Sequence, residues 1–107
     1  MPPGRLVWTS GQISVDAAGH VPEGWEAQAR QVFANVGRAL EGAGATWRDV
    51  VKLSFFVTGV EHLATIRAVR DEHVDTTNPP TSSLVQVAGL VRPELLLEVE
   101  AVAWLPR

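Results

Sequence analysis

Two glutamates, Glu98 and Glu100, stand at alternate positions near the end of the chain. Every second residue from Leu95 to Ala103 is apolar, which predicts a β-strand with one buried face, because successive side chains of a strand point to opposite sides. The two carboxylates then share the other face, about 7 Å apart, with large apolar groups such as Trp104. A carboxylate in such surroundings needs water or a partner. We therefore expect function on this face.

Two serines, Ser82 and Ser83, follow a pair of prolines at positions 79 and 80. Proline cannot continue a helix, so the serines are expected on a turn that enters a strand. Hydroxyl groups at such a place either cap backbone groups or contact a ligand, and the residues alone leave both interpretations open. Ser82 is not expected to be a nucleophile, because that role needs a positioned base.

The histidines offer no such base by their spacing. His20, His62 and His73 are predicted on a turn, at a helix start and on a helix face, with nothing that brings them together. No His-x-His or His-Glu-x-x-His pattern occurs, so no metal site is predicted. The glycine-rich segment 42–44 is expected to end a helix rather than open one, which makes it a poor phosphate loop. No cofactor is expected.

Hydrophobic periodicity indicates an α+β fold in which two helices cover one face of a mixed β-sheet. The predicted elements, in chain order, are strands over 6–10 and 13–15, a helix from 22–24 to 42–44, a strand over 50–58, a helix over 60–74, and strands over 83–88 and 95–104. The strand over 50–58 is expected to bury one apolar face, made of Val51, Leu53, Phe55 and Val57.

The second face of the predicted sheet has no helix to cover it. Residues such as Phe56 and Trp104 are too apolar to leave in water, whereas Lys52 and the two glutamates are too polar for a dry core. Self-association with polar crevices would satisfy both constraints. The alternative is an ordinary solvated sheet face with a few exposed apolar groups.

The amino-acid composition limits the classes of protein to which this chain can belong. With 107 residues, the chain is expected to form a single domain over 1–107. Its net charge of −3 and its scattered basic residues argue against a nucleic-acid partner, because affinity for phosphates rests on clustered Lys and Arg. The absence of cysteine excludes disulfides and thiolate zinc sites. No apolar run is long enough to span a bilayer and no signal-peptide pattern opens the chain, so a cytoplasmic location without membrane contact is expected.

Four segments carry a pattern that extends beyond single residues. They are Thr9-Ser10-Gly11-Gln12-Ile13, Leu40-Glu41-Gly42-Ala43-Gly44-Ala45-Thr46-Trp47-Arg48-Asp49-Val50-Val51-Lys52, the Pro79-Pro80-x-x-Ser83 turn, and Glu98-Val99-Glu100-Ala101-Val102-Ala103. Together these segments resemble the Rid family, the reactive-intermediate deaminases also called YjgF, UK114 or endoribonuclease L-PSP proteins. The similarity runs in unbroken order from about Gly4 to Ala103.

The resemblance implies a chorismate-mutase-like fold, a homotrimeric barrel, and ligand clefts between subunits. In active members, an arginine in a Pro-x-Arg-Ser turn clamps the carboxylate of a 2-imino acid or enamine, and a glutamate on the last strand positions the hydrolytic water. By position, the glutamate matches Glu100, whereas Glu98 is expected to make structural pairs. The resemblance also implies substrate contacts, which fall on Ser10, Gly11, Ser82, Ser83 and Leu84.

This sequence departs from the family pattern where the substrate would be held. Ser82 stands in place of the arginine, and a serine has neither the charge nor the reach of a guanidinium. Arg5 and Arg92 are candidate replacements, although nothing in the sequence places either one in the cleft. On the second predicted helix, Arg67 and Arg70 stand where the family usually has Asn and Tyr. Family members also carry a pocket tyrosine in an N-terminal Pro-Tyr-Ser motif, and this sequence has no tyrosine.

The leading hypothesis is a homotrimer that binds small molecules and hydrolyses imines, enamines or related labile C–N compounds, with non-standard anchoring of the substrate. The alternative is a non-catalytic member that binds a metabolite or a partner protein through the same cleft. RNA cleavage, which is also attached to the family name, is disfavoured by the acidic charge and the lack of a basic stripe.

Overall fold

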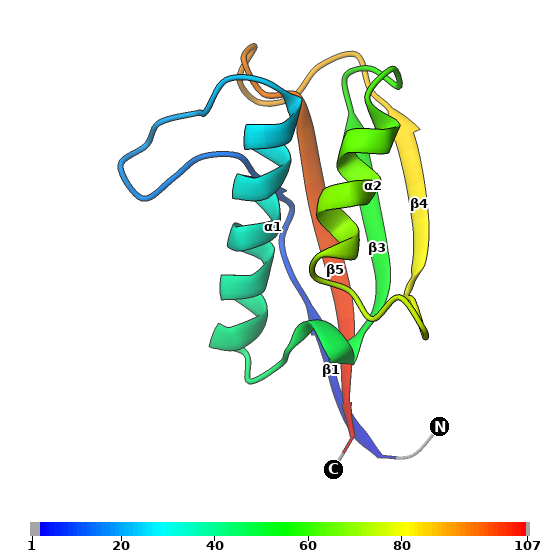
Figure 1. Cartoon of the computed structure of the whole chain (residues 1–107). Helices are drawn as coiled ribbons and strands as arrows, with labels where there is room; N and C mark the ends of the chain where they lie inside the picture. The colour runs from blue at the N-terminus through cyan, green and yellow to red at the C-terminus, as the bar shows by residue number, and fades with distance from the viewer. Residues whose placement is uncertain (1–2, 107) are drawn as a thin grey trace.

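The computed structural model describes residues 3–106 and has two layers, a mixed β-sheet and a pair of helices on one face of it (Figure 1). The elements are β1 (Gly4–Trp8), β2 (Gln12–Ile13), α1 (Trp25–Gly42), a 3₁₀ turn (Trp47–Asp49), β3 (Val50–Val57), α2 (Leu63–Asp71), β4 (Thr81–Gln86) and β5 (Leu97–Pro106). The predicted α+β class and element order are confirmed.

The sheet has the strand order β1-β5-β3-β4, with the short β2 also paired to β5. β3 and β4 are parallel and are joined through α2, whereas β5 is antiparallel to β1, β2 and β3. A parallel pair needs a long crossover connection, which α2 provides here. The central strand β5 therefore carries its glutamates between β3 on one side and the two N-terminal strands on the other.

The helix α1 forms where the sequence repeats apolar residues at helical spacing. Five of these side chains are fully buried against the sheet: Ala29, Val32, Phe33, Val36 and Leu40. The helix begins after Gly24 and ends before Gly44, and both glycines have positive φ angles, of 91° and 80°. Such angles strain other residues, so the glycines define both ends of the helix, close to the predicted limits.

The helix α2 is shorter at both ends than the predicted 60–74. Its last turn closes where the backbone N–H groups of His73 and Val74 both donate to the carbonyl of Arg70. Val74 is nevertheless buried, so the apolar pattern continues past the helix into the turn. Periodicity reports which side chains are buried and not where the helical hydrogen bonds stop.

The predicted buried face of β3 was wrong at its first position. Val50 is buried at 6% exposure, whereas Val51 is exposed at 44%. A β-bulge causes the difference, since Val50 pairs with Ala103 while Lys52 pairs with the adjacent Val102. The extra residue reverses the alternation of side chains at this point. From Leu53 onward the predicted face is correct.

The face of the sheet away from the helices is uncovered in the described chain and carries large apolar groups. Leu6 and Trp8 on β1 are exposed at 60% and 63%. Their cross-strand neighbours on β5 are Trp104 and Val102. The indole Nε1 of Trp104 is buried and has no hydrogen-bond partner in residues 3–106. This face has the mixed character expected from the sequence.

Candidate functional site

Glu100 lies on the helix-free face in a row that crosses three strands. Its cross-strand neighbour on β3 is Ser54, and the neighbour of Ser54 on β4 is Ser83. Lys52 donates from Nζ to Ser83 Oγ at 2.8 Å, so the only lysine is bonded to a hydroxyl in this row. Glu100 is half-buried, and no hydrogen bond or ion pair to its carboxylate is found within residues 3–106. A carboxylate placed in this way can accept a proton from a bound water molecule.

Glu98 shares this face and packs against Gly11. A Cβ atom built on Gly11 would overlap the carboxylate of Glu98, so a side chain at position 11 would displace the end of the Glu98 side chain. Ser10 is held by Gln12, which donates from Nε2 to the Ser10 carbonyl at 3.2 Å and to its hydroxyl at 3.1 Å. The predicted contact residues Ser10 and Gly11 thus lie at the edge of the same face, beside Glu98.

Thr9 attaches the loop over residues 9–11 to β5, close to Glu100. Its backbone N–H donates to the carbonyl of Ala101 at 2.9 Å, and its Oγ1 accepts from the Ala101 N–H at 3.0 Å. The side chain is 7% exposed. Sequence analysis missed this positioning role, because the bond joins residues that are 92 positions apart.

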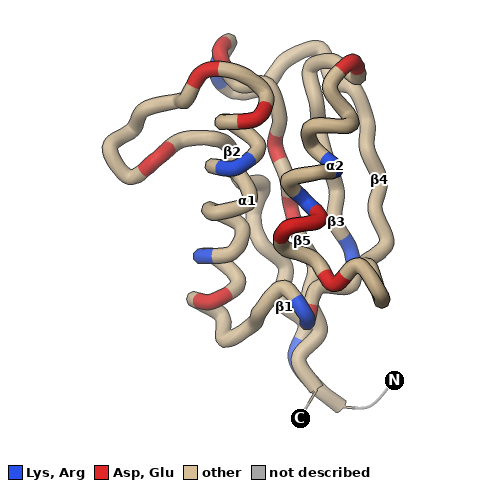
Figure 2. Tube along the Cα trace, in the orientation of Figure 1, with Lys and Arg blue, Asp and Glu red and all other residues tan. Residues whose placement is uncertain are grey.

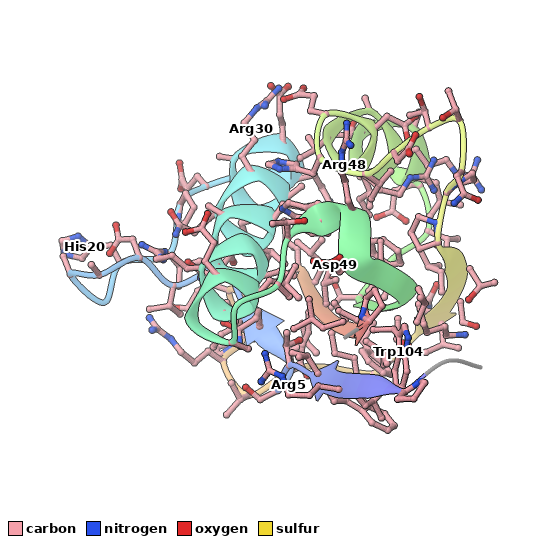
Figure 3. The ribbon with its side chains drawn as sticks, turned by 90° about the horizontal axis from the view of Figure 1, so that it is seen from below. Arg5, His20, Arg30, Arg48, Asp49 and Trp104 are labelled. Carbon is pink, nitrogen blue, oxygen red and sulfur yellow. The ribbon has the colours of Figure 1, made fainter. Side chains whose placement is uncertain are left out.

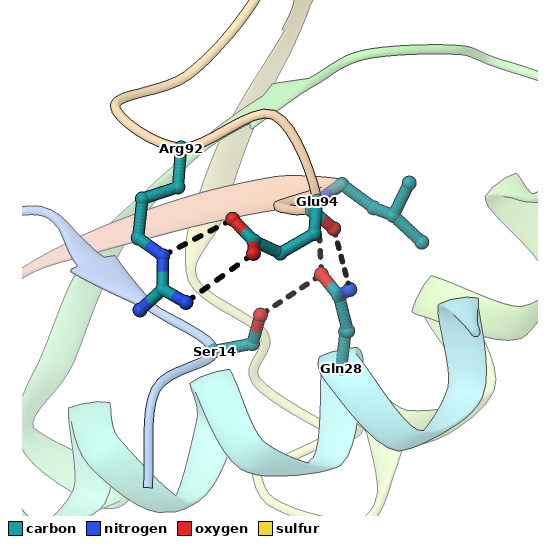
Figure 4. A network of polar contacts seen from close by, with 5 residues as sticks. Ser14, Gln28, Arg92 and Glu94 are labelled. Carbon is teal, nitrogen blue, oxygen red and sulfur yellow. Dashed lines mark hydrogen bonds and ion pairs between the residues drawn. The ribbon is translucent and has the colours of Figure 1, made fainter. Parts of the chain in front are cut away.

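Gln28 on α1 secures the chain just before β5 begins (Figure 4). It is 2% exposed, donates to the carbonyl of Glu94 at 2.8 Å, and accepts from the Leu96 N–H at 2.9 Å and from Ser14 Oγ at 2.8 Å. These bonds satisfy buried polar groups that would otherwise destabilise the core. They also fix where β5, and hence both glutamates, enters the sheet.

Ser82 and Leu84 point to the other side of β4, toward α2. Their neighbours on β3 are the buried Leu53 and Phe55. Both residues line a pocket of 150 Å³ between α2 and β4, which also involves Arg67 and Arg70. Ser82 and Arg70 border a second, adjoining pocket of 330 Å³ as well. Sequence analysis noted both arginines as departures from the family but did not place them beside Ser82.

The arginines named from sequence as candidate replacements lie elsewhere. Arg5 donates from Nη2 to the carbonyl of Ala43 at 3.1 Å, and Figure 3 shows it beside β1. Arg92 forms an ion pair with Glu94 at 3.1 Å, in the loop before β5 (Figure 4). Neither one lines a pocket with Ser82.

The histidines do not converge. His20 lies in the protruding loop (Figure 3), His62 stacks on Trp25 with ring centroids 5.2 Å apart, and His73 stacks on Phe33 at 5.4 Å. Burial lowers the pKa of His73. Within residues 3–106 no group of three His, Cys, Asp or Glu side chains is placed to hold a metal ion. In the same part of the chain, no helix is long and apolar enough to cross a membrane.

The arrangement of the chain recurs in proteins of known sequence and structure. The family model described as endoribonuclease L-PSP matches residues 1–105. The chain therefore belongs to the Rid family. The chorismate-mutase-like fold expected from the resemblance is confirmed by solved Rid structures. That of RidA from an Antarctic Psychrobacter superimposes with a TM-score of 0.89 at 31% identity, over 98% of this chain and 85% of that one.

Two further Rid proteins carry names that bear on chemistry. A curated 2-iminobutanoate/2-iminopropanoate deaminase of Salmonella typhimurium is 40% identical over 103 residues, which span 94% of this chain and 80% of the relative. The structure of Escherichia coli TdcF with bound serine superimposes with a TM-score of 0.85 at 37% identity, over 97% of this chain and 84% of that one.

Proposed function

We propose that this Rid-family chain hydrolyses a small imine or enamine, releasing ammonia and a carbonyl compound, with Glu100 as the residue that activates water. The observation that carries the proposal is the Glu100 carboxylate, half-buried on an uncovered face and without a partner in the described chain. The deaminase name of the Salmonella relative supports the same reaction class.

The chemistry needs one carboxylate and one water molecule. Glu100 accepts a proton from the water as the water oxygen bonds to the C=N carbon, and it returns the proton to the nitrogen. The amino alcohol then collapses, because the hydroxyl proton passes to nitrogen as the C–N bond breaks. The sum is one imine and one water converted to one carbonyl product and one ammonia. An enamine reaches the same path after tautomerising to the imine, which adds a proton to its β-carbon and removes one from its nitrogen.

The site is proposed to lie between copies of the chain in a homotrimer. Exposed Leu6 and Trp8 on the helix-free face are costly in water and are covered if three copies join through their sheets. The substrate then contacts Ser10 and Gly11 at one margin of the cleft, and Ser82, Ser83 and Leu84 at the other. Because position 82 lacks arginine, the anchoring of the substrate differs from the usual family clamp.

The test is direct turnover. Freshly generated 2-iminopropanoate or 2-aminoacrylate is mixed with the purified protein, and the release of ammonia and pyruvate is followed against the spontaneous rate. The proposal expects acceleration. No acceleration by the wild-type chain would overturn the proposal, and acceleration gained only on Ser82→Arg would show that the arginine is required for turnover.

A second candidate is a Rid protein that binds a small molecule or a partner without converting it. The observation in its favour is Ser82, which cannot provide the charged anchor of active members. It predicts ligand binding at the same cleft in the absence of turnover, so the assay above separates the two candidates.

A further inference from the structure

The pocket between α2 and β4 combines an apolar floor with a basic mouth. Four side chains form its apolar part: Phe55, Leu63, Ile66 and Leu84. Arg67, Arg70 and the serines at 82 and 83 complete the lining, and no acidic residue belongs to it. Its volume of 150 Å³ suits a molecule of a few non-hydrogen atoms. Such a pocket fits a small organic anion with a short aliphatic tail.

The two arginines are arranged to act together. They are three residues apart on α2, so their two positive charges are neighbours on the helix surface. Arg70 donates from Nε to Asp71 Oδ1 at 2.9 Å, and its side chain is 27% exposed. Within residues 3–106 its Nη groups and the whole Arg67 guanidinium donate no hydrogen bond. Hydrogen-bond donors on α2 are therefore left unused, in a region where Figure 2 shows both basic and acidic positions.

We propose that Arg70, assisted by Arg67 and the Ser82 hydroxyl, binds the carboxylate of the substrate, so that α2 supplies the anion clamp that β4 lacks. The substrate class is then a short-chain 2-imino or 2-enamino acid, whose aliphatic end packs on Phe55 and Leu84. This inference rests on the proposed function for the identity of the reacting group. A guanidinium holds a carboxylate through two parallel hydrogen bonds, and serine adds a third donor.

The position of the pocket is compatible with this role. β4 is the edge strand of the sheet, so the pocket opens at the sheet edge rather than into the core. A substrate held there by its carboxylate and its aliphatic end has its C=N carbon between the two, at the mouth of the pocket, where a neighbouring copy of the chain provides Glu100. One chain alone cannot do so, because its own Glu100 lies on the opposite face of the sheet.

Binding of a stable product analogue tests the clamp without turnover. 2-Oxobutanoate and its neutral amide are titrated into the wild-type protein and followed by calorimetry. The acid is expected to bind more tightly than the amide. Arg70→Gln should weaken acid binding about tenfold or more, the factor expected for a charged hydrogen bond, and Arg67→Gln should weaken it less. Equal binding of acid and amide by the wild type, or no binding of the acid, would overturn the proposal.

The controls address charge and folding. Arg48→Gln removes the same charge from an exposed position that lines neither pocket, and it should leave acid binding unchanged. Arg70→Lys keeps the charge but loses the planar fork, so an affinity between those of wild type and Arg70→Gln is expected. Adding Ser82→Arg to Arg70→Gln should restore binding. Wild-type affinity in the Arg67→Gln/Arg70→Gln double variant would refute the clamp even if every single variant were uninformative.

Two outcomes separate this inference from the proposed function. If the acid binds through Arg70 but the wild type hydrolyses no imine, the clamp stands and the proposed function fails. If the wild type hydrolyses 2-iminopropanoate and Arg70→Gln leaves KM unchanged, the function stands and the clamp fails. For Arg70→Gln, we expect a raised KM with little change in kcat, because the clamp binds the substrate equally in the ground state and in the transition state.

Discussion

Glu100 and Ser82 lie on opposite faces of the same sheet. Glu100 is cross-strand to Ser54, which is the neighbour of Ser83 on β4, whereas Ser82 is the neighbour of the buried Leu53. Side chains alternate along a strand, so the one-residue step from Ser83 to Ser82 moves from the open face to the helix face. If Glu100 activates water as proposed and position 82 contacts the same substrate, the two residues must therefore come from different copies of the chain.

The two glutamates should differ in their effect on activity. Glu100→Gln is isosteric and removes the proton acceptor, so imine hydrolysis should fall about 100-fold or more, the usual range for loss of an acid–base group. Glu98→Gln is the matched control on the same strand face, and a much smaller loss is expected there. Ammonia release by both variants is the measurement. A Glu100→Gln protein as active as wild type would remove the catalytic assignment.

The helix-free face should hold the assembly together. Trp8→Glu places a charge on a residue that is 63% exposed in the single chain, and we expect it to break the homotrimer into smaller species. Light scattering after gel filtration checks this against the mass of three 11.6 kDa chains. Val91→Glu is the control, because Val91 is 78% exposed and lies in the loop before β5. A wild-type protein that runs as a monomer would contradict the proposal.

A side chain at Gly11 should displace the Glu98 carboxylate. Gly11→Ala places a Cβ where the end of the Glu98 side chain lies, and because that flexible side chain can turn away, the unfolding free energy should drop by no more than about 1 kcal/mol, the low end for overpacked sites. Urea denaturation measures the change. Adding Glu98→Ala should recover most of it, since the obstructing atoms are gone. Gly42→Ala, where a Cβ would meet nothing within 4 Å, should cause no loss.

His73 should make stability depend on pH. Burial against Phe33 and Trp47 lowers its pKa in the folded state from the ordinary 6.5; the charge of Glu72 raises this pKa by less, and the charge of Arg30 lowers it slightly further. The unfolded chain therefore binds the proton more readily, so the stabilisation is present above pH 6.5 and is lost as the pH falls through the lower folded pKa.

The variant His73→Phe keeps an aromatic ring at this place but cannot titrate. Its unfolding free energy should change less than that of wild type between about pH 7 and about pH 5. Urea denaturation at the two pH values gives the comparison. Parallel pH dependence in both proteins would show that other groups, such as the carboxyl of Glu72, dominate acid sensitivity.

The local patterns of this sequence determined most of the fold. Alternation in β5 and the helical spacing of α1 depend only on neighbouring residues, and the glycines near 24 and 44 end α1 by their own conformational freedom. The pairing of Glu98 and Glu100 on one face also followed from alternation alone. The motifs that resemble the Rid family matched Glu100 and Ser82 to positions of the family pattern without any knowledge of packing.

Tertiary structure decided what periodicity does not encode. The bulge at Val50 adds one residue against β5, and its effect on Val51 depends on a partner strand whose paired residues are 50 or more positions away, such as Val102 opposite Lys52. Arg70 and Ser82 line the same pocket only because α2 forms the crossover between the parallel strands β3 and β4. Sequence shows which side chains share an element, because that spacing is local. Which elements face each other depends on the burial of apolar side chains summed over the whole core. This packing of α2 against β4 placed Arg67 and Arg70 at the pocket.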